Sequence, residues 1–328
     1  MDDKKVGFIG LGKYLPENRL TNKELEKIVD TTDDWIVTRT GIKERRIARD
    51  DEATSDMAVR AAKNALQNAN LEPKDIDLII VATITPDMFF PATACIVQNK
   101  LGANHAPAFD ISVACSGFLY GVAIASQFVK SGIYKHVLLI AAEKMSSVTD
   151  WKDRSTCVLM GDGAGAAILS EVKEGGILSV HLGADGSKGD LLCMPAGGSR
   201  IPASMTTVEA RLHFLKMQGN ELFKRAVKIM AEAAQKVTEP LGLKGSDISL
   251  VIPHQANKRI LNAVAKRMGI DPEEKLYLNI EKYGNMSAAS SAVALCEAVE
   301  EDRVKKGDLI LLDAFGAGLT WGAVLIKW

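Results

Sequence analysis

The chain has 328 residues, of which 47% are hydrophobic and 25% are charged, and its formal net charge is −1. This composition is that of an ordinary globular protein, long enough for about two domains with a sizeable core. A charge so close to zero supplies no general field that would attract nucleic acid or an anionic membrane.

The N-terminal stretch and the cysteines bear on the cellular compartment. Residues 1–5 lead into the short apolar run 6–10 without the cationic flank, long apolar region and cleavage site of a secretory signal. The five cysteines are scattered and never spaced as Cys-x-x-Cys, which argues against a disulfide framework and a zinc site. We therefore expect a cytoplasmic protein with reduced thiols, no metal and no membrane association.

The chain opens with a predicted strand at residues 6–11, followed by closely spaced glycines. A dinucleotide-binding fingerprint would need a third glycine where Leu15 stands, and Pro16 follows where the required helix should start. We therefore exclude this cofactor site. Hydrophobic periodicity and end signals predict the later elements. These are a helix at 21–30 with Thr21 and Glu24 as a capping box, an amphipathic helix at 53–70, a buried strand at 77–83, and a helix after Gly219 that ends before Pro240.

Two distant parts of the chain share one pattern. The spacing Leu-x-x-x-Asp-Ile-x-Leu at residues 71–78 recurs at residues 243–250, an offset of 172. The same offset aligns the apolar residues 137–142 with residues 309–314. A single gap-free register across two strand pairs indicates an internal duplication.

The duplication predicts an α/β fold built from two halves, residues 1–172 and 173–328. Each half contributes helices and strands, and the halves pack about a pseudo-twofold axis as stacked layers of sheet and helix. Residues 183–204, rich in glycine, predict a long irregular segment of the kind that forms lids or binding loops.

Cys115 lies where a β-branched run meets an apolar helical pattern that begins at Phe118. The unpaired N–H groups and the macrodipole of a helix N-terminus favour a thiolate by roughly 0.3–1 kcal/mol. Cys115 is therefore a candidate nucleophile with a mildly lowered thiol pKa. The alternative is a buried cysteine that acts as a small hydrophobic residue.

Two candidate partners for Cys115 come from the second half. His254 directly follows the repeated strand, and Asn285 lies two residues before Ser287, the position equivalent to Cys115 under the offset of 172. Equivalent junctions of duplicated halves meet near the axis, so Cys115, His254 and Asn285 can share one pocket. Taken singly, such a histidine is more often structural and such an asparagine more often a cap or turn.

Four ordered motifs and an N-terminal block carry a resemblance to a known family. They are Val113-Ala114-Cys115-Ser116-Gly117, Pro253-His254-Gln255-Ala256-Asn257, residues 283–290, residues 315–322 and residues 31–42. Together they resemble β-ketoacyl-acyl carrier protein synthase III, the initiating condensing enzyme of bacterial type II fatty acid synthesis, over essentially the whole chain. The resemblance implies a thiolase-like five-layer αβαβα fold, a homodimer, and a catalytic site of Cys115, His254 and Asn285.

The implied reaction is a decarboxylative Claisen condensation of a short acyl-CoA, acetyl-CoA first, with malonyl-acyl carrier protein, without a metal or redox cofactor. Cys115 would carry the acyl group as a thioester, while His254 and Asn285 would stabilise an enolate. The backbone N–H groups of Cys115 and Ala317 would form the oxyanion hole. Related enzymes often have glycine at the Ala317 position, and alanine serves there if the local φ is allowed.

The resemblance also implies binding roles. CoA and its pantetheine arm would contact Thr31, Trp35, Arg39, Arg154, Phe223 and Asn257. The acyl pocket would lie around Phe90, which in the family reaches across the dimer, and Leu159. The acidic carrier protein would dock on basic residues of two helices, for which solvated helix faces are the simpler interpretation. They are Lys224, Arg225, Lys228, Lys258, Arg259, Lys266 and Arg267.

Three other functions compete with this prediction. A related Cys-His-Asn condensing enzyme of polyketide-like metabolism is the nearest alternative. A cysteine hydrolase also uses Cys, His and Asn, but the duplication and the donor-like place of Asn285 oppose it. A non-catalytic partner subunit is disfavoured because all three reactive residues are present.

Overall fold

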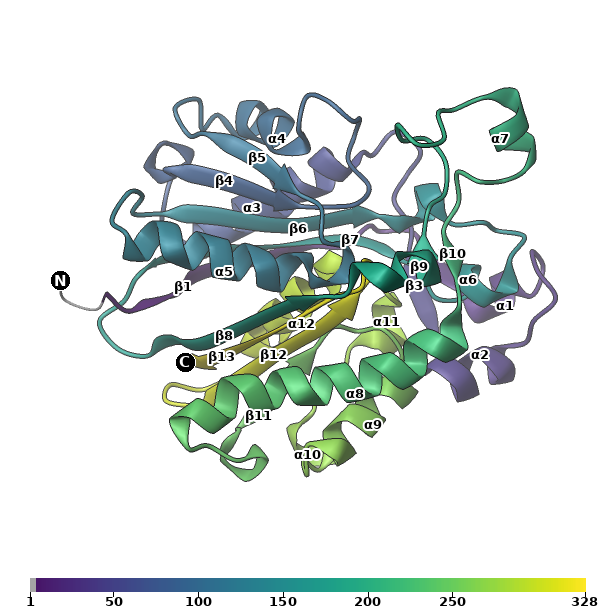
Figure 1. The fold of residues 1–328 in the computed structure, drawn as a ribbon. Coiled ribbons are helices and arrows are strands. Elements are labelled where there is room, and N and C mark those ends of the chain that lie inside the picture. Colours follow the sequence, from purple (N-terminus) through teal and green to yellow (C-terminus); the bar gives the residue numbers. More distant parts are fainter. Residues whose placement is uncertain (1–3) are drawn as a thin grey trace.

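Two β-sheets alternate with three layers of helices in this computed structural model, which describes residues 4–328 (Figure 1). Residues 1–3, part of the stretch considered above for a secretory signal, lie outside the described residues. Helices α3 (Thr54–Ala69) and α4 (Thr93–Leu101) cover the first sheet, and α8 (Gly219–Thr238) and α9 (Lys258–Arg267) cover the second. Helices α5 (Gly117–Lys130) and α12 (Ala288–Glu300) lie between the sheets. The predicted five-layer αβαβα class is confirmed.

The two sheets have the same strand order. The first runs β1 (Val6–Tyr14), β7 (Asp162–Glu171), β6 (Val137–Lys144), β4 (Leu78–Ala82) and β5 (Ala108–Ile111). The second runs β8 (Gly176–Ala184), β13 (Thr320–Lys327), β12 (Leu309–Gly316) and β11 (Leu250–Pro253). In the first sheet β4 pairs in parallel with both β6 and β5, while β7 and β1 continue the sheet with antiparallel pairs. In the second sheet β11 and β12 are parallel, while β13 and β8 continue the sheet with antiparallel pairs. At the place of β5, the second sheet has only an isolated parallel bridge from Val251 to Leu276.

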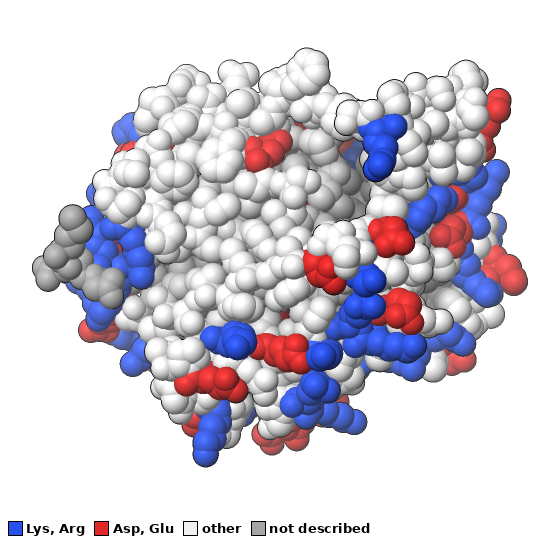
Figure 2. Space-filling view, in the orientation of Figure 1, with Lys and Arg blue, Asp and Glu red and all other residues white. Residues whose placement is uncertain are grey.

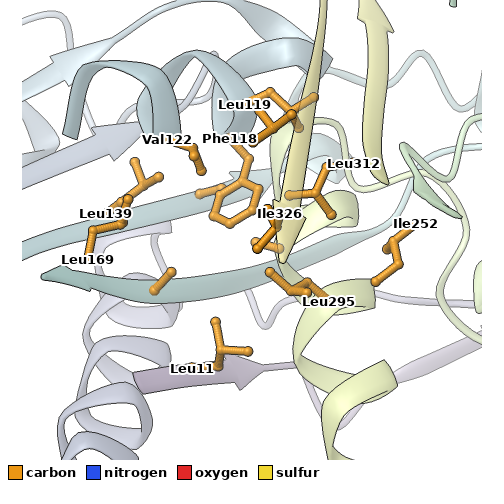
Figure 3. Packing of buried hydrophobic residues seen from close by; sticks show 14 of the residues in the cluster. Leu11, Phe118, Leu119, Val122, Leu139, Leu169, Ile252, Leu295, Leu312 and Ile326 are labelled. Atoms are coloured by element: carbon orange, nitrogen blue, oxygen red, sulfur yellow. The ribbon is translucent and has the colours of Figure 1, made fainter. Parts of the chain in front are cut away.

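The central core fills the space between the sheets and holds the two inner helices in place. Phe118 of α5 and Leu295 of α12 are fully buried there against Leu139 of the first sheet and Leu312 of the second (Figure 3). Each such side chain contributes roughly 1.5–3 kcal/mol through burial. The two inner helices begin close to one another, since a Cβ atom on Gly117 would lie 3.2 Å from the Cβ of Ala288.

Shorter elements complete the fold. The remaining strands form two ribbons, β2 (Arg19–Thr21) with β3 (Glu44–Arg46) and β9 (Leu192–Cys193) with β10 (Lys216–Met217). The remaining α-helices are α1 (Asn22–Leu25), α2 (Asp33–Thr40), α6 (Arg154–Cys157), α7 (Met205–Glu209), α10 (Pro272–Lys275) and α11 (Ile280–Tyr283). The 3₁₀ turns are η1 (Pro73–Asp75), η2 (Ala114–Ser116), η3 (Met145–Val148), η4 (Gly186–Leu191), η5 (Glu239–Leu241) and η6 (Gly245–Asp247).

Local sequence signals place most of these elements correctly. The capping box of Thr21 and Glu24 is present, but α1 has only four residues, so the predicted helix at 21–30 was too long. Helix α8 ends one residue before Glu239-Pro240 as expected. The predicted irregular segment 183–204 is partly wrong, because β8 extends to Ala184 and η4 and β9 follow.

No helix within residues 4–328 combines the length and apolarity needed to cross a membrane.

Candidate active site

Cys115 lies on η2, between strand β5 and helix α5, so the predicted strand-to-helix junction is confirmed. Ala114 before it adopts a positive φ of 45°, which turns the chain sharply at this point. The thiol is 8% exposed, and burial raises its pKa to about 12 although contact with Ser287 acts in the opposite direction. The expected lowering of the thiol pKa is therefore wrong, because burial disfavours the charged thiolate more than the Ser287 contact favours it.

The turn between β12 and β13 lies directly against Cys115. A Cβ atom on Gly316 would be 2.8 Å from the Cys115 nitrogen and 3.0 Å from its Cβ, so only glycine allows this approach. Thr320 fixes the turn, because its hydroxyl donates to the Ala317 oxygen at 2.9 Å and lies 3.3 Å from the Val113 oxygen. Ala317 is not among the residues of 4–328 with a positive φ, so alanine is accommodated without strain there.

His254 follows β11 directly, and its backbone N–H donates to the Asp313 oxygen at 2.8 Å. The ring is 2% exposed, and burial lowers its pKa to about 4, so it is neutral at pH 7. Nδ1 has no hydrogen-bond partner among residues 4–328. Since no group there accepts a hydrogen bond from Nδ1, the neutral ring can carry its proton on Nε2.

Two hydrogen bonds, one from its backbone and one to its side chain, hold Asn285 in place. Its backbone N–H donates to the Leu159 oxygen at 2.8 Å, and its side-chain oxygen accepts from the Ser287 N–H at 2.9 Å. Since the oxygen is engaged by a backbone donor, the side-chain NH₂ is the end that remains for a ligand.

The three residues Cys115, His254 and Asn285 line one cavity of about 140 Å³. Phe223 and Asn257 line the same cavity, as do apolar residues of α8 and the end of β12. The cavity thus brings a thiol, a neutral imidazole and an amide donor to one space, an arrangement suited to acyl transfer and to stabilising an oxyanion.

A second, apolar cavity of about 210 Å³ also reaches Cys115 and Asn285. Its walls come from separate segments, and they include Ile84, Met145, Val148, Met160, Leu215 and Met217. Leu159, expected around the acyl pocket, lines the first cavity instead. Phe90 lines neither and is 84% exposed.

Family comparisons identify the chain. Its residues 109–186 match the 3-oxoacyl-[acyl-carrier-protein] synthase III family, and residues 239–328 match that family's C-terminal part. The β-ketoacyl-[acyl-carrier-protein] synthase III of Caldanaerobacter subterraneus subsp. tengcongensis is 60% identical over 324 residues, 98% of each chain. That of Clostridioides difficile is 57% identical over 324 residues, 99% of this chain and 98% of the other. The chain belongs to the β-ketoacyl-acyl carrier protein synthase III family.

Solved structures of related condensing enzymes have the same fold. The enzyme of Aquifex aeolicus is 52% identical, with a TM-score of 0.91 over 98% of this chain and 100% of the other. The priming β-ketosynthase of the R1128 polyketide pathway is 37% identical, also with a TM-score of 0.91, over 99% and 96% of the two chains. The protein is therefore an acyltransferase of the condensing type that acts in fatty acid synthesis.

The residues of this synthase expected at the nucleotide lie together at the surface. The guanidinium carbons of Arg39 and Arg154 lie 4.8 Å and 4.9 Å from the centre of the Trp35 ring. At 4.9 Å no planar ring fits between Arg154 and Trp35, so this arginine must move for an adenine to enter. The buried hydroxyl of Thr31 has no partner among residues 4–328.

Asn257 has a structural role that the sequence did not indicate. As the N-cap of α9 it accepts from the Arg259 N–H at 2.9 Å, and its NH₂ donates to the Arg39 oxygen at 3.1 Å. It thus ties α9 to α2 at the edge of the first cavity.

The basic residues of α8 and α9 are mostly on the surface. Lys224, Lys228, Lys258, Arg259, Lys266 and Arg267 are exposed, and Arg225 is half-buried. Some are already paired, Lys224 with Glu221 at 3.2 Å and Lys228 with Glu232 at 3.9 Å. Figure 2 shows blue and red side chains interspersed over α8, so this face is mixed rather than uniformly positive.

Sequence reasoning missed Glu143, a fully buried carboxylate near Cys115. One of its oxygens accepts hydrogen bonds from Thr83 and Thr85 hydroxyls at 3.1 Å and 2.6 Å, and from two backbone N–H groups. Burial raises its pKa to about 7. A charged residue at the end of the apolar run 137–142 was the available signal.

Within residues 4–328 no three His, Cys, Asp or Glu side chains are placed to hold a metal ion.

Proposed function

We propose that this enzyme condenses a short acyl-CoA, acetyl-CoA first, with malonyl-acyl carrier protein to give a 3-oxoacyl-acyl carrier protein through an acyl thioester on Cys115. The observation that carries the proposal is the single cavity lined by Cys115, His254 and Asn285. The relatives' names, β-ketoacyl-[acyl-carrier-protein] synthase III, agree with a carrier-protein substrate.

In the first half-reaction the Cys115 sulfur attacks the thioester carbonyl of acyl-CoA. The carbon–sulfur bond to CoA breaks, and the thiol proton of Cys115 ends on the CoA sulfur. The N–H groups of Cys115 and Ala317 hold the oxyanion, and removing one such donor typically costs about 2.7–4 kcal/mol. The contact of Gly316 with Cys115 supports this assignment, because it brings the backbone at Ala317 beside the nucleophile.

In the second half-reaction the malonyl group loses carbon dioxide and leaves an enolate. His254 Nε2–H and the Asn285 NH₂ donate to the enolate oxygen while its carbon attacks the acyl group on Cys115. The Cys115 sulfur leaves as a thiolate and takes up a proton from water to restore the thiol. These steps call for no metal or redox cofactor, because acyl transfer and decarboxylation need only hydrogen-bond donors and a sulfur nucleophile.

The remaining site residues are assigned as binding groups. Trp35 and Arg154 would stack on the adenine of CoA, Thr31 and Arg39 would contact the nucleotide end, and Phe223 and Asn257 would line the path of the pantetheine arm. The unpaired Thr31 hydroxyl and the shared cavity lining support these roles. The apolar second cavity would receive the acyl chain, in place of a pocket around Leu159.

We further propose a cytoplasmic homodimer of duplicated halves, residues 1–172 and 173–328. Strand β5 is an edge strand, and the neighbouring Met88, Phe89 and Phe90 are 50%, 77% and 84% exposed. An apolar group of this kind is typical of a protein interface. Phe90 would then close the partner's acyl cavity, and the exposed basic residues of α8 and α9 would contact the carrier protein.

The experiment that tests the function follows each half-reaction by mass. Incubation with acetyl-CoA should add one acetyl group to the peptide that contains Cys115, and later addition of malonyl-acyl carrier protein should yield acetoacetyl-acyl carrier protein. Absence of the adduct, or its persistence in a Cys115→Ser variant, would exclude Cys115 as the nucleophile. Release of acetate instead of condensation would indicate a hydrolase.

A polyketide-priming role is the second candidate, favoured by the similarity to the R1128 priming β-ketosynthase. An acyl-CoA chain-length profile distinguishes the two. Preference for acetyl-CoA supports fatty acid initiation, while exclusive use of a longer or unusual starter unit supports the specialised pathway.

A further inference from the structure

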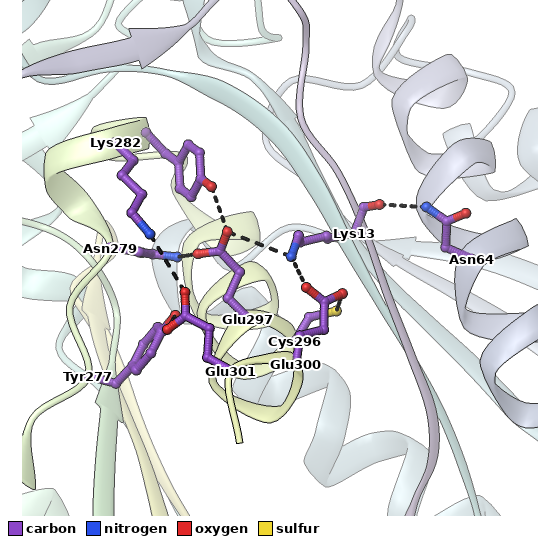
Figure 4. A network of polar contacts seen from close by, with 10 residues as sticks. Lys13, Asn64, Tyr277, Asn279, Lys282, Cys296, Glu297, Glu300 and Glu301 are labelled. Carbon is purple, nitrogen blue, oxygen red and sulfur yellow. Dashed lines mark hydrogen bonds and ion pairs between the residues drawn. The ribbon is translucent and has the colours of Figure 1, made fainter. Parts of the chain in front are cut away.

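Glu297 of α12 is a buried carboxylate outside the site described above, and both of its oxygens are engaged. One accepts from the Tyr283 hydroxyl at 2.5 Å, and the other accepts from the Asn279 NH₂ at 2.9 Å (Figure 4). The Lys13 ammonium of β1 lies 3.6 Å from the first oxygen. Glu297 is 5% exposed, so its negative charge is balanced inside the protein by Lys13 across the two halves.

The Asn279 contact leads to His254. The backbone N–H of Asn279 donates to the side-chain oxygen of Gln255 at 3.0 Å, and the Gln255 NH₂ donates to the Pro253 oxygen at 2.9 Å. Gln255 is fully buried and follows His254 in the chain. Its side chain therefore ties the backbone just before the catalytic histidine to the backbone of Asn279.

The Tyr283 contact leads to Asn285. Tyr283 ends α11, and only Gly284, with φ 67° and ψ −156°, separates it from Asn285. This peptide runs tightly against its surroundings, since a Cβ on Gly284 would lie 2.7 Å from the Leu159 oxygen. The Tyr283 hydroxyl bond thus anchors the start of the segment that presents the Asn285 amide.

We propose that Glu297 is a positioning residue that holds the His254 loop and the Asn285 loop at a fixed separation, and so serves the decarboxylation step selectively. The inference rests on the proposed function of His254 and Asn285 as the two enolate donors. One carboxylate reaches both loops, through Asn279 on one side and Tyr283 on the other.

Condensation should be affected and acylation spared, because Cys115 is held by other elements than the His254 and Asn285 loops. Enolate stabilisation needs both donors within hydrogen-bond distance of one oxygen, and a displacement of about 1 Å can cost about 100-fold in rate. Cys115 stands on η2 of the first half, and its oxyanion donors are set by the β12–β13 turn. Loosening Glu297 should therefore disturb condensation and spare acylation.

The experiment measures the two half-reactions separately in Glu297→Gln and Tyr283→Phe enzymes. Glu297→Gln is isosteric and removes one of the two acceptors, while Tyr283→Phe deletes one hydrogen bond without opening a cavity. We expect condensation from preformed acetyl-Cys115 to slow about 10- to 100-fold in both. Acetylation by acetyl-CoA should stay within about 2-fold of wild type, and the KM for malonyl-acyl carrier protein should be unchanged.

Glu300→Gln is the matched control. Glu300 lies on the same helix as Glu297 and also pairs with Lys13, but its side chain is 55% exposed and it reaches neither loop. Both half-reactions should proceed at the wild-type rate in this variant. Equal slowing of acetylation and condensation, or normal condensation in both test variants, would overturn the proposal. A wild-type enzyme that acetylates Cys115 and then yields no acetoacetyl product would contradict the proposed function instead.

Discussion

The backbone N–H of Ser287 donates a hydrogen bond of 2.9 Å to the side-chain oxygen of Asn285. The bond fixes which end of the amide is available to a substrate, because an N–H can pair only with the oxygen. The Asn285 NH₂ is left as the donor.

Asn285→Asp tests this orientation. The new carboxylate can still accept from the Ser287 N–H, but it repels the enolate instead of donating to it. We expect acetylation of Cys115 to persist and condensation to fall by about 100- to 1,000-fold. His254→Ala should give the same division between the half-reactions. Loss of acetylation in either variant would show that these residues act on the nucleophile itself.

The reactivity of Cys115 should increase with pH well above neutrality. Burial raises the thiol pKa to about 12, so the thiolate fraction grows about tenfold for each pH unit below that value. Iodoacetamide alkylation of the Cys115 peptide, followed by mass spectrometry from pH 6 to pH 9, should rise throughout. A plateau with a midpoint near pH 7 would mean that the helix N-terminus prevails over burial.

Gly316→Ala should damage the first half-reaction. The added Cβ would lie 2.8 Å from the Cys115 nitrogen, so the nucleophile or the β12–β13 turn must shift. We expect the acetylation rate to fall by about 100-fold. Gly198→Ala is the control, because its Cβ meets open space. Normal acetylation in the Gly316→Ala enzyme would show that the β12–β13 turn does not form part of the oxyanion hole.

Glu143 should make stability depend on pH. Its pKa is raised to about 7, so the folded protein holds this proton more tightly than the unfolded chain does. The contribution of Glu143 to the free energy of unfolding therefore falls as pH rises from about 4.5 through about 7. Glu143→Gln removes that loss while keeping an oxygen for the four donors. The difference in the free energy of unfolding between the variant and the wild type should therefore shift in favour of the variant by up to about 3 kcal/mol from pH 5 to pH 8. Thermal unfolding at both pH values measures the gain, and a pH-independent difference would refute it.

Arg259→Glu should weaken use of malonyl-acyl carrier protein. Arg259 is exposed on α9 and stacks 5.9 Å from the centre of the Phe223 ring at the edge of the first cavity. Charge reversal should raise the KM for the carrier substrate about 10-fold, with a smaller effect for acetyl-CoA. Lys236→Glu, exposed near the other end of α8, should change neither. Equal effects on both substrates would argue against a docking face.

The sequence predicts those features that depend on local pattern or on the duplication. Cys115 and His254 follow strands that hydrophobic runs reveal, so their junctions could be located from the chain alone. The thiol pKa could not, because the burial that raises it comes from tertiary packing, which includes the approach of Gly316, about 200 residues away in the sequence. The second cavity was missed for a similar reason: Ile84, Met160 and Leu215 meet only in the folded protein. Glu297 leaves no spacing signal either, since its partners are Lys13, Asn279 and Tyr283.

The tie from the Asn257 amide to the Arg39 oxygen joins α9 to α2 beside the cavity that Cys115, His254 and Asn285 line together. If the pantetheine arms of both thioesters enter this cavity past the tie, the two arms cannot lie in the cavity at the same time. The first product, free CoA, must then depart before the carrier protein enters. Initial rates at varied concentrations of both substrates should accordingly give parallel double-reciprocal lines, the kinetic pattern of a ping-pong enzyme.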